Sequence, residues 1–379
     1  MTAALAPASP ARTTGTSSVT TRLGYVGPNW YASVMGTGIL PVALLGLPFH
    51  VPGAATVAAA LWALAATLLV AVTAATVLHH RHHPTVANGH RTDPVMVHFY
   101  GAPAMALMTV GAGAMLAGQR WIGAEAALAL HAVLWTAGTL LGIATAVLVP
   151  YAAFTRLALR GDEAFGGWLM PVVPPMVSAA TGALLVPHVP AGQARESFLL
   201  LCYGLFGLTL LASLVVITLI VHRMVRYGAG PAARVPTLWI VLGPLGQSVT
   251  AAHHLGLLAP GVLPAPYGTA FESLALVYGI PVWGFAMLWL TVAALTTWRT
   301  VRAGMPFTLT WWSFTFPVGT VVTGTSGLAG VTGLLPLALV AGVLFGCLVL
   351  AWAVVLTRTV AGVLDGSLLR APQPVVAPR

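Results

Sequence analysis

An aromatic residue followed closely by a proline recurs five times in this chain, each time within an apolar segment of membrane length. The recurrences lie about 70 residues apart, and a period of this length predicts one structural unit used five times. A proline inside a membrane helix frees a main-chain carbonyl and bends the helix, which is tolerated where protein or a water-filled cavity satisfies that group. The pattern therefore predicts five bent helices around a path. The recurring prolines are Pro41, Pro103, Pro174, Pro244 and Pro317.

Composition identifies the membrane as the setting of these segments. Hydrophobic residues make up 58% of the 379 residues and charged residues only 6%, values outside the range of soluble globular proteins. A helix needs about 20 residues to cross the apolar core of a bilayer. Ten stretches meet this requirement, at residues 28–47, 54–79, 95–118, 125–150, 168–187, 197–222, 236–258, 270–297, 308–330 and 334–357.

The ten stretches alternate in character. The odd-numbered members carry the aromatic and proline features, whereas the even-numbered members are uniformly rich in Leu, Ala and Val, as expected of helices that face lipid. We therefore predict an all-α integral membrane protein of ten transmembrane helices arranged as five helical hairpins. Residues 23–358 form this domain, between a disordered N-terminal tail at 1–22 and a C-terminal tail at 359–379.

The distribution of arginine sets the expected orientation. All sixteen basic residues are arginines, and only Arg120 and Arg195 lie on the less basic side of the predicted membrane. The positive-inside rule then places both termini in the cytoplasm of a multi-pass protein of the cell inner membrane. The arginines are scattered singly, without the basic stripe of a nucleic-acid-binding protein, so no nucleic acid is predicted as a partner.

The scarcity of acidic residues favours an anion as the transported species. Carboxylates inside a membrane normally handle cations or protons, and of seven acidic residues only Glu272 is expected within the bilayer, since the other six lie in loops or at helix ends. Glu272 is either an interfacial carboxylate, capping its helix or pairing with Arg195, or the coupling residue of a proton-coupled anion exporter. A net charge of +9 without a central arginine suits weak binding and flux.

Hydroxyl groups and glycines are the remaining pore-lining candidates. Gly36, Thr37 and Gly38 near the first proline either permit close helix packing or set the pore width. The hydroxyls available on the odd-numbered segments are Ser33, Thr37, Thr109, Ser178, Thr181, Ser248, Thr250, Ser313, Thr315, Thr320 and Thr323.

An aromatic ring next to the last recurring proline is a candidate gate. Phe316 directly precedes Pro317, and a bulky apolar ring there could close a narrow pore by filling and dewetting it. Simple packing is the alternative for Phe316, and Phe314 is an equal candidate on these grounds alone.

The histidines offer two further hypotheses. Four histidines at 79–83 form either a metal-binding tract or merely a polar loop. His98, His131, His253 and His254 lie near or within predicted spans, which leaves a haem-binding membrane redox protein as an alternative of another class. Cys202 and Cys347 both occur in apolar runs and are interpreted as core residues, so neither a disulfide nor a thiolate metal site is predicted. We predict no cofactor, no metal site and no enzymatic activity.

Three segments resemble a known transporter family. Residues 28–40 (PNWYASVMGTGIL), 243–248 (GPLGQS) and 311–317 (WWSFTFP) are similar to the tellurite-resistance and dicarboxylate transporter (TDT) family, which includes sulfite and malate transporters and plant guard-cell slow anion channels. Ten helices in five hairpins match this family over about residues 28–358. The 243–248 segment is closer to the dicarboxylate and sulfite branch than to the tellurite branch.

The resemblance implies a quasi-fivefold arrangement of the hairpins around a central pore, a homotrimer with one pore per protomer, and a gate at the phenylalanine before the ninth-span proline, here Phe316. It implies transport of small anions such as sulfite, a dicarboxylate such as malate, or a tellurite-related anion. The function expected from the sequence is therefore that of an anion channel or facilitator in the membrane lipid.

Overall fold

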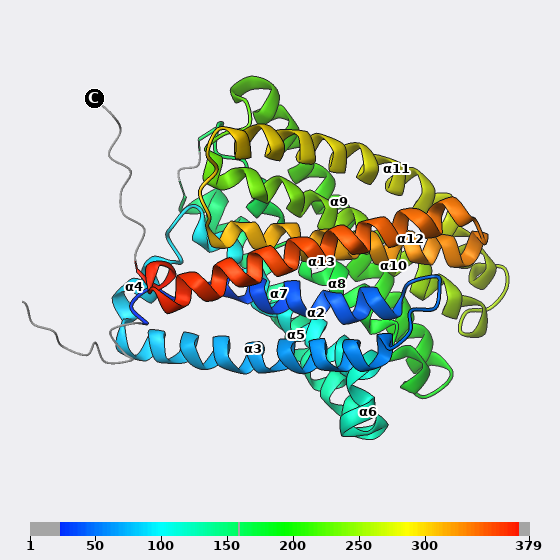
Figure 1. Ribbon diagram of the computed structural model, residues 1–379. Coiled ribbons are helices and arrows are strands. Elements are labelled where there is room, and N and C mark those ends of the chain that lie inside the picture. Colours follow the sequence, from blue (N-terminus) through cyan, green and yellow to red (C-terminus); the bar gives the residue numbers. More distant parts are fainter. Residues whose placement is uncertain (1–22, 158–159, 371–379) are drawn as a thin grey trace, which may run out of the picture.

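The computed structural model describes residues 23–157 and 160–370, so the N-terminal tail predicted at 1–22, and residues 371–379 of the C-terminal tail predicted at 359–379, lie outside this part of the chain. The described residues form helices and connections, without a β-strand (Figure 1). Each of the ten predicted spans coincides with a helical segment. The last helix continues to Leu364, beyond the span predicted to end at residue 357, so the domain boundary at 358 and the start of the C-terminal tail at 359 are wrong.

The five odd-numbered segments, here called the inner segments, each consist of a 3₁₀ helix followed by an α-helix. They are η1 (Pro28–Trp30) with α2 (Tyr31–Leu45), η2 (Met96–Tyr100) with α5 (Gly101–Gly113), η4 (Gly166–Leu169) with α8 (Pro174–Gly182), η6 (Ala232–Val241) with α10 (Leu242–Leu258), and η8 (Leu309–Phe314) with α12 (Phe316–Thr332). The π-helical turn η3 (Ala114–Gly118) and the short α6 (Gln119–Ile122) extend α5.

The even-numbered segments, here called the outer helices, are long and continuous. They are α3 (Ala54–His82), α7 (Ala124–Thr155), α9 (Gln193–Tyr227), α11 (Tyr267–Arg302) and α13 (Leu335–Leu364). Short elements complete the described chain: α4 (Pro84–Gly89), η5 (Val186–His188), η7 (Ala259–Gly261) and η9 (Ser367–Leu369).

Six helices are long and apolar enough to cross a membrane within the described residues. They are the five outer helices and the continuous stretch Met96–Ile122. The α-helices of the other four inner segments are shorter, with 15 residues in α2, 9 in α8 and 17 each in α10 and α12.

The recurring prolines mostly begin helices instead of bending them. Pro174 and Pro317 occupy the first two positions of their α-helices, and Pro103 and Pro244 the third. Only Pro41 lies well inside its helix. Because the first N–H groups of a helix have no intrahelical partner, proline at these positions costs no hydrogen bond. The discontinuity therefore lies at the junction between 3₁₀ and α geometry, and only Pro41 has the position inside an α-helix that was expected from the sequence.

The inner segments form a closed ring of contacts. Helix α2 packs against α5, α5 against α8, α8 against α10, α10 against α12, and α12 returns to α2, while each inner helix also packs against the outer helix that follows it. The burial of the helices agrees with this arrangement. In the most apolar 18-residue stretch of Met96–Ile122, 72% of the residues are buried, against 17–33% in the corresponding stretches of the outer helices. The exposed faces of the outer helices carry large apolar side chains, as lipid contact requires.

Tryptophans of the outer helices attach them to the inner ring. The indole N–H of Trp62 donates to the carbonyl of Val110 at 3.1 Å, and that of Trp135 to the carbonyl of Ser178 at 2.9 Å. Trp352 on α13 donates to the hydroxyl of Thr37 at 3.1 Å. Since water is absent from an apolar bilayer core, such bonds satisfy the indoles where nothing else can.

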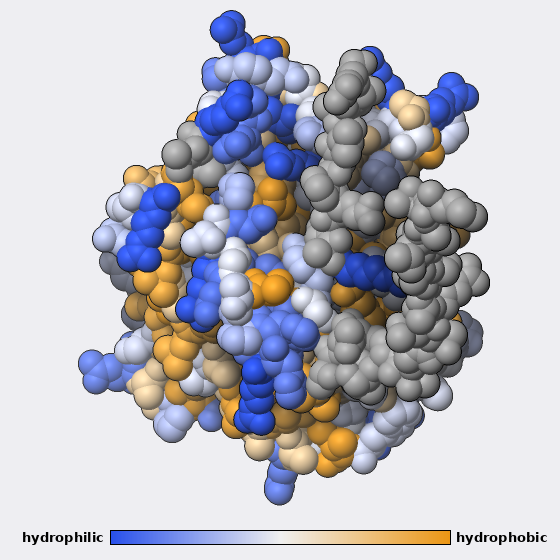
Figure 2. Space-filling model, turned by 90° about the vertical axis from the view of Figure 1, so that its left-hand side faces the viewer, coloured by the Kyte–Doolittle hydropathy of each residue, from blue (hydrophilic) through white to orange (hydrophobic). Residues whose placement is uncertain are grey.

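The two ends of the bundle differ in polarity. The first described residues and the end of α13 lie at the same end, where α3, α9 and α11 also carry arginine in their last turns (Figure 1). Figure 2 looks onto this end and shows hydrophilic residues gathered over it, above flanks that are largely hydrophobic. We call it the arginine-rich end. Arg120 on α6 and Arg195 on α9 lie toward the opposite end.

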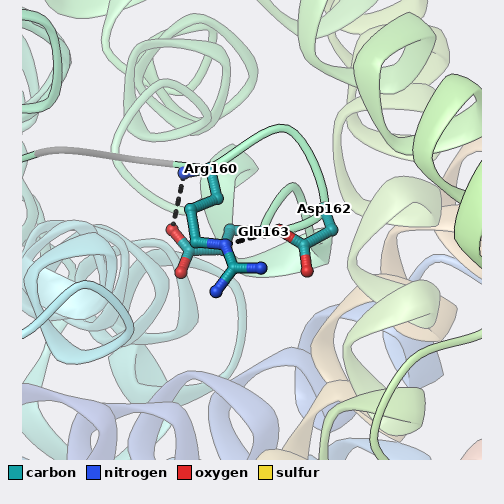
Figure 3. A network of polar contacts seen from close by, with 3 residues as sticks. All are labelled: Arg160, Asp162 and Glu163. Atoms are coloured by element: carbon teal, nitrogen blue, oxygen red, sulfur yellow. Dashed lines mark hydrogen bonds and ion pairs between the residues drawn. The ribbon is translucent and has the colours of Figure 1, made fainter.

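The single ion pair among the described residues belongs to a loop at the arginine-rich end. The Arg160 guanidinium lies 3.4 Å from the Asp162 carboxylate, and the Arg160 main-chain N–H donates to the Glu163 carboxylate (Figure 3). With side chains 76% and 42% exposed, the pair contributes about 0–1 kcal/mol.

The suggested roles of Glu272 as a cap or as a partner of Arg195 are wrong. The Arg195 guanidinium donates to the main-chain oxygens of Val189 and Pro187, at 2.9 and 3.3 Å. Glu272 is exposed and lies a turn past the start of α11, too far along the helix to cap it. The core interpretation of the cysteines is right for Cys202, which is buried, but wrong for Cys347, which is exposed on α13.

Candidate functional site

A cavity of about 580 Å³ lies inside the ring and is lined by all five inner segments. It extends along α12 from Phe316 to Gly330 and along α2 from Ile39 to Gly46. These stretches lie in the α-helical parts of the inner segments, which follow the 3₁₀ parts, so the cavity occupies the half of the bundle away from the arginine-rich end. Its polar lining residues are Thr109, Thr181, Gln247, Thr250, His253, His254, Thr323 and Ser326.

Phe316 stands at the inner limit of this cavity. It is the first residue of α12, it is only 3% exposed, and it is the cavity-lining residue of α12 nearest the arginine-rich end. The chain just before it is held firmly, since the Thr315 hydroxyl donates to the carbonyl of Trp312 at 2.6 Å and the Trp312 indole donates to Thr359 at 3.1 Å. These hydrogen bonds fix the residues just before α12 and so hold the start of the helix, including Phe316, in place.

The structure distinguishes the two gate candidates by position. Phe314 does not line the cavity and instead packs edge-on against Trp239 and Trp311, with ring centroids 5.3 and 5.7 Å apart. A two-residue separation across the 3₁₀ to α junction therefore places the two rings in different surroundings.

Gly36, Thr37 and Gly38 pack helices together and do not line the cavity. A Cβ atom at Gly36 would collide with the side chain of Thr315, and one at Gly38 would lie 2.9 Å from the Thr109 methyl group. Thr37 is fully buried and accepts the hydrogen bond from Trp352. These residues let α2 approach α12, α5 and α13 closely. Close helix packing is one of the two roles that the sequence suggested for them. The recurring prolines also lie outside the cavity lining.

The walls of the cavity carry no fixed charge. Among the described residues that line it there is no Asp, Glu, Lys or Arg, and His253 and His254 are its only titratable groups. Glu272 lies outside the lining, on an outer helix. Such walls neither repel an anion by their own charge nor trap it by a fixed opposite charge.

Four of the hydroxyls proposed from the sequence line the cavity: Thr109, Thr181, Thr250 and Thr323. Three of them also donate back to a main-chain carbonyl four residues earlier, as buried hydroxyls on helices do. Ser326 was missed as a candidate, although it follows Thr323 at the i, i+3 spacing that shares a helix face. Gln247 was not predicted as a lining residue, although it lies in the segment 243–248 that carries the family resemblance.

Two of the membrane histidines fasten the end of the short helix α8. His131 on α7 bonds through Nε2 to the carbonyl of Thr181 at 3.0 Å, and His254 on α10 bonds to the carbonyl of Ala180. The last carbonyls of a helix lack intrahelical partners, so these imidazoles complete α8 where it stops early. His98 lies at the arginine-rich end, stacked on Trp168 with centroids 5.7 Å apart.

The histidine tract at 79–83 belongs to a packed cluster. The Nδ1 atom of His79 bonds to the carbonyl of Leu23 at 2.9 Å, and its ring stacks on that of His90 at 5.5 Å. No group of three or more His, Cys, Asp or Glu in the described chain could hold a metal ion. In the structure this tract joins the N-terminal segment to the end of α3.

Buried His90 makes stability depend on pH. Burial, followed by the neighbouring His79, lowers the pKa of His90 below the usual 6.5. The unfolded chain then binds a proton that the folded chain does not, so this contribution to stability is complete above pH 6.5 and is lost as the pH falls below that value. We expect the melting temperature of the purified protein to fall between about pH 7.5 and 5.5, and less steeply in His90→Phe.

The exposed His82, in the same tract, provides the control for this measurement. His82→Phe should leave the slope of melting temperature against pH as in the wild type. An equal slope for His90→Phe and wild type would show that other groups cause the pH dependence.

A ring of helices around a cavity without fixed charge, set in an apolar shell, is the architecture expected of a membrane transporter or channel. Comparison with known proteins makes the class specific. The profile of the voltage-dependent anion channel family (SLAC1) matches residues 25–360, and the chain belongs to this family. The resemblance seen in the sequence is thereby confirmed.

Relatives of this chain extend over most of its length. It is 27% identical over 346 residues to an uncharacterized transporter of Methanocaldococcus jannaschii, covering 90% of this chain and 95% of the relative. It is also 25% identical over 306 residues to a sulfite efflux pump of Trichophyton rubrum and 26% identical over 306 residues to one of Arthroderma otae, in both cases covering 79% of this chain and 80% of the relative.

Proposed function

We propose that this protein conducts small anions passively across the membrane, through a pore that runs inside the ring of inner segments and is blocked at rest by Phe316. The observation that carries the proposal is the cavity itself, which all five inner segments line, which lacks fixed charge, and which ends at Phe316. Family membership supports transport of anions as the class of activity.

In this proposal all ten helical segments cross the membrane, as five hairpins in a quasi-fivefold arrangement. The interrupted inner segments are compatible with this topology, because irregular backbone is tolerated at membrane depth when protein surrounds it. The arginine-rich end lies on the cytoplasmic side of the inner membrane, and the cavity lies toward the opposite side. The resemblance further implies a homotrimer with one pore in each protomer.

Sulfite is the first candidate substrate. Two of the relatives are sulfite efflux pumps, and the cavity offers hydroxyl, amide and imidazole groups to an oxyanion. Malate is the second candidate, and a tellurite-related anion the third. A dicarboxylate brings two charges into a cavity whose walls supply no fixed cation, which makes the smaller anion the better match.

Flux through proteoliposomes tests the proposed function. Purified protein is reconstituted, and passive movement of chloride, nitrate, sulfite and malate is compared with that in empty vesicles, for wild type and for Phe316→Ala. Passive flux of at least one anion through the alanine variant, without a proton gradient, is the expected result. Failure of both proteins to move any of the four anions would contradict a pore for small anions.

Replacement of Glu272 tests the rival, proton-coupled mechanism. Because Glu272 is exposed on α11 and does not line the cavity, we expect Glu272→Gln to leave anion flux within about twofold of wild type. Flux is measured with and without an imposed pH gradient. If wild-type flux requires the gradient and Glu272→Gln abolishes it, the protein is a coupled exporter and Glu272 carries the coupling.

A further inference from the structure

Arg223 carries a buried charge that no acidic side chain balances. It lies in the last two turns of α9 and is only 5% exposed. All seven acidic residues of the chain belong to the part that the structure describes, and the single ion pair there joins Arg160 to Asp162. Buried arginines are normally paired, because a charge that leaves water without a counter-charge is costly. The buried guanidinium of Arg223 therefore points to a bound anion.

The acidic residues of the arginine-rich end have other partners. Asp93 and Asp365 each accept hydrogen bonds from main-chain N–H groups two or three residues further on. Asp162 and Glu163 both interact with Arg160, in the loop shown in Figure 3. None of these four carboxylates forms an ion pair with the buried guanidinium, so its counter-charge has to come from outside the described chain.

The guanidinium of Arg223 is fixed on one side and open on the other. Its Nε group donates to the carbonyl of Ala164 at 2.9 Å and its Nη1 group to the carbonyl of Gly228 at 2.8 Å. These bonds use only two of the five N–H donors of a guanidinium. The Nη2 group forms no hydrogen bond with the described residues and is not one of their enclosed, unpaired atoms, so it reaches accessible space. Because so little of the side chain is exposed, that space admits only a small ligand.

Arg234 supplies a second positive charge at the same place. Its guanidinium lies over the ring of Phe165, with 5.4 Å between Cζ and the ring centroid, and its charge is close enough to repel that of Arg223. Phe165 directly follows Ala164, which accepts the hydrogen bond from Arg223. The Arg234 guanidinium itself donates no hydrogen bond to the described residues. An anion that both guanidiniums contact would offset their mutual repulsion.

The two arginines lie where the inner segments begin. The 3₁₀ helices form a ring of contacts of their own, in which η1 contacts η2, η2 contacts η4, η4 contacts η6, η6 contacts η8, and η8 returns to η1. Helices η4 and η6 meet closely, since a Cβ atom at Gly166 would collide with the carbonyl of Thr237. Phe165 caps η4 and Arg234 belongs to η6, so the pair of arginines lies at the rim of this ring, on the other side of Phe316 from the cavity.

We propose that Arg223 and Arg234 form an entry site for a small oxyanion at the arginine-rich end of the ring. The proposal rests on the proposed function and names the charged site that recruits its substrate. Guanidinium groups bind the oxygens of such anions through paired N–H donors. Two positive charges at the rim raise the local concentration of anions before the constriction. Because the charges lie outside the constriction, the cavity beyond Phe316 stays free of fixed charge and releases the anion readily.

The concentration dependence of flux tests the entry site. Sulfite flux is measured at increasing sulfite concentration and constant ionic strength, in proteoliposomes containing Phe316→Ala alone or combined with Arg234→Gln. Arg234 is the residue to replace because its side chain donates no hydrogen bond that holds the fold, whereas Arg223 donates two. Loss of one of the two charges should raise the half-saturating sulfite concentration about fivefold, the effect of losing a charge-assisted hydrogen bond that is partly exposed to water.

Arg226 provides a matched control. It lies on α9 three residues after Arg223, but it is exposed and forms no ion pair with the described residues. Arg226→Gln removes the same charge from the same end of the protein. Because salt screens an exposed charge, the half-saturating concentration should stay within about twofold of that of Phe316→Ala alone. If Arg234→Gln and Arg226→Gln shift it equally, surface charge in general is responsible, and the entry site is overturned while the pore stands.

Thermal stability, measured without flux, separates failure of the site from failure of the proposed function. A ligand that binds only the folded protein raises the melting temperature. Sodium sulfite should raise it for the detergent-purified wild type, relative to the bulky anion of sodium gluconate at equal ionic strength. This rise should be lost in Arg234→Gln and kept in Arg226→Gln, and that pattern without flux in Phe316→Ala would support the site and contradict the pore. An equal rise in Arg234→Gln and wild type, or stabilisation by phosphatidylglycerol but not by sulfite, would overturn the site.

Discussion

Replacement of Phe316 by alanine is expected to raise passive anion flux at least about tenfold, equivalent to lowering the barrier by about 1.4 kcal/mol. The ring is 3% exposed and ends the cavity at the start of α12. Removing it deletes the bulk that fills the constriction and allows water to enter, so an anion keeps part of its hydration shell on the way through. Flux of sulfite and chloride into proteoliposomes is the measurement, at equal amounts of reconstituted protein.

Phe314 gives this experiment a control of the same size. It precedes Phe316 by two residues but packs against Trp239 and Trp311 and does not line the cavity. Phe314→Ala should leave flux close to wild type, with some loss of thermal stability from the lost aromatic contacts. If the two alanine variants raise flux equally, general loosening of the bundle is responsible, and Phe316 is not a gate. If neither raises it, the pore is closed elsewhere.

Replacement of Gly246 by alanine is expected to prevent the assembly of the ring. A Cβ atom there would lie 2.5 Å from main-chain atoms of Thr320 and Val321, and a rigid backbone cannot give way as the end of a side chain can. Overpacking of this kind costs about 1–3 kcal/mol or more, which exceeds the gain in helix propensity from glycine to alanine of about 1 kcal/mol. We expect a lower melting temperature and a smaller yield of monodisperse protein in detergent.

Gly243 lies one turn earlier on the same helix and provides the comparison. A Cβ atom at Gly243 has open space, with no neighbouring atom within 4 Å, so Gly243→Ala should be neutral or slightly stabilising. The two variants differ only in what the added methyl group meets. Equal stability of Gly246→Ala and Gly243→Ala would mean that α10 and α12 are not as close in the protein as described.

Sequence patterns predicted the helices well because their signals are local. Each outer helix is one long apolar run bounded by arginine, and hydropathy over about 20 residues is enough to find it. The inner segments were found through their recurring aromatic and proline residues. The internal geometry of these segments was not predicted, because whether a proline bends a helix or begins one depends on where the preceding 3₁₀ turn stops.

The candidate site was only partly predictable. The inner helices are apolar and buried on nearly every side, so hydrophobic periodicity cannot tell which face turns toward the pore. Gly36, Thr37 and Gly38 resemble a pore-lining motif in sequence yet pack against other helices. Gln247 and Ser326, about 80 residues apart in the sequence, both line the cavity, although no local signal joins them.

The sequence by itself determined the membrane setting, the positions of the ten helical segments, the asymmetric placement of arginine and the family. These properties follow from composition and short-range order. Only the tertiary structure decided that the inner segments close into a ring, that Phe316 and not Phe314 lines the cavity, and that Gln247, His253 and Ser326 are among the other lining residues. Each of these depends on the rotation and register of one helix against another, which are set by contacts such as that of Gly246 with Thr320 and are not encoded in any single segment.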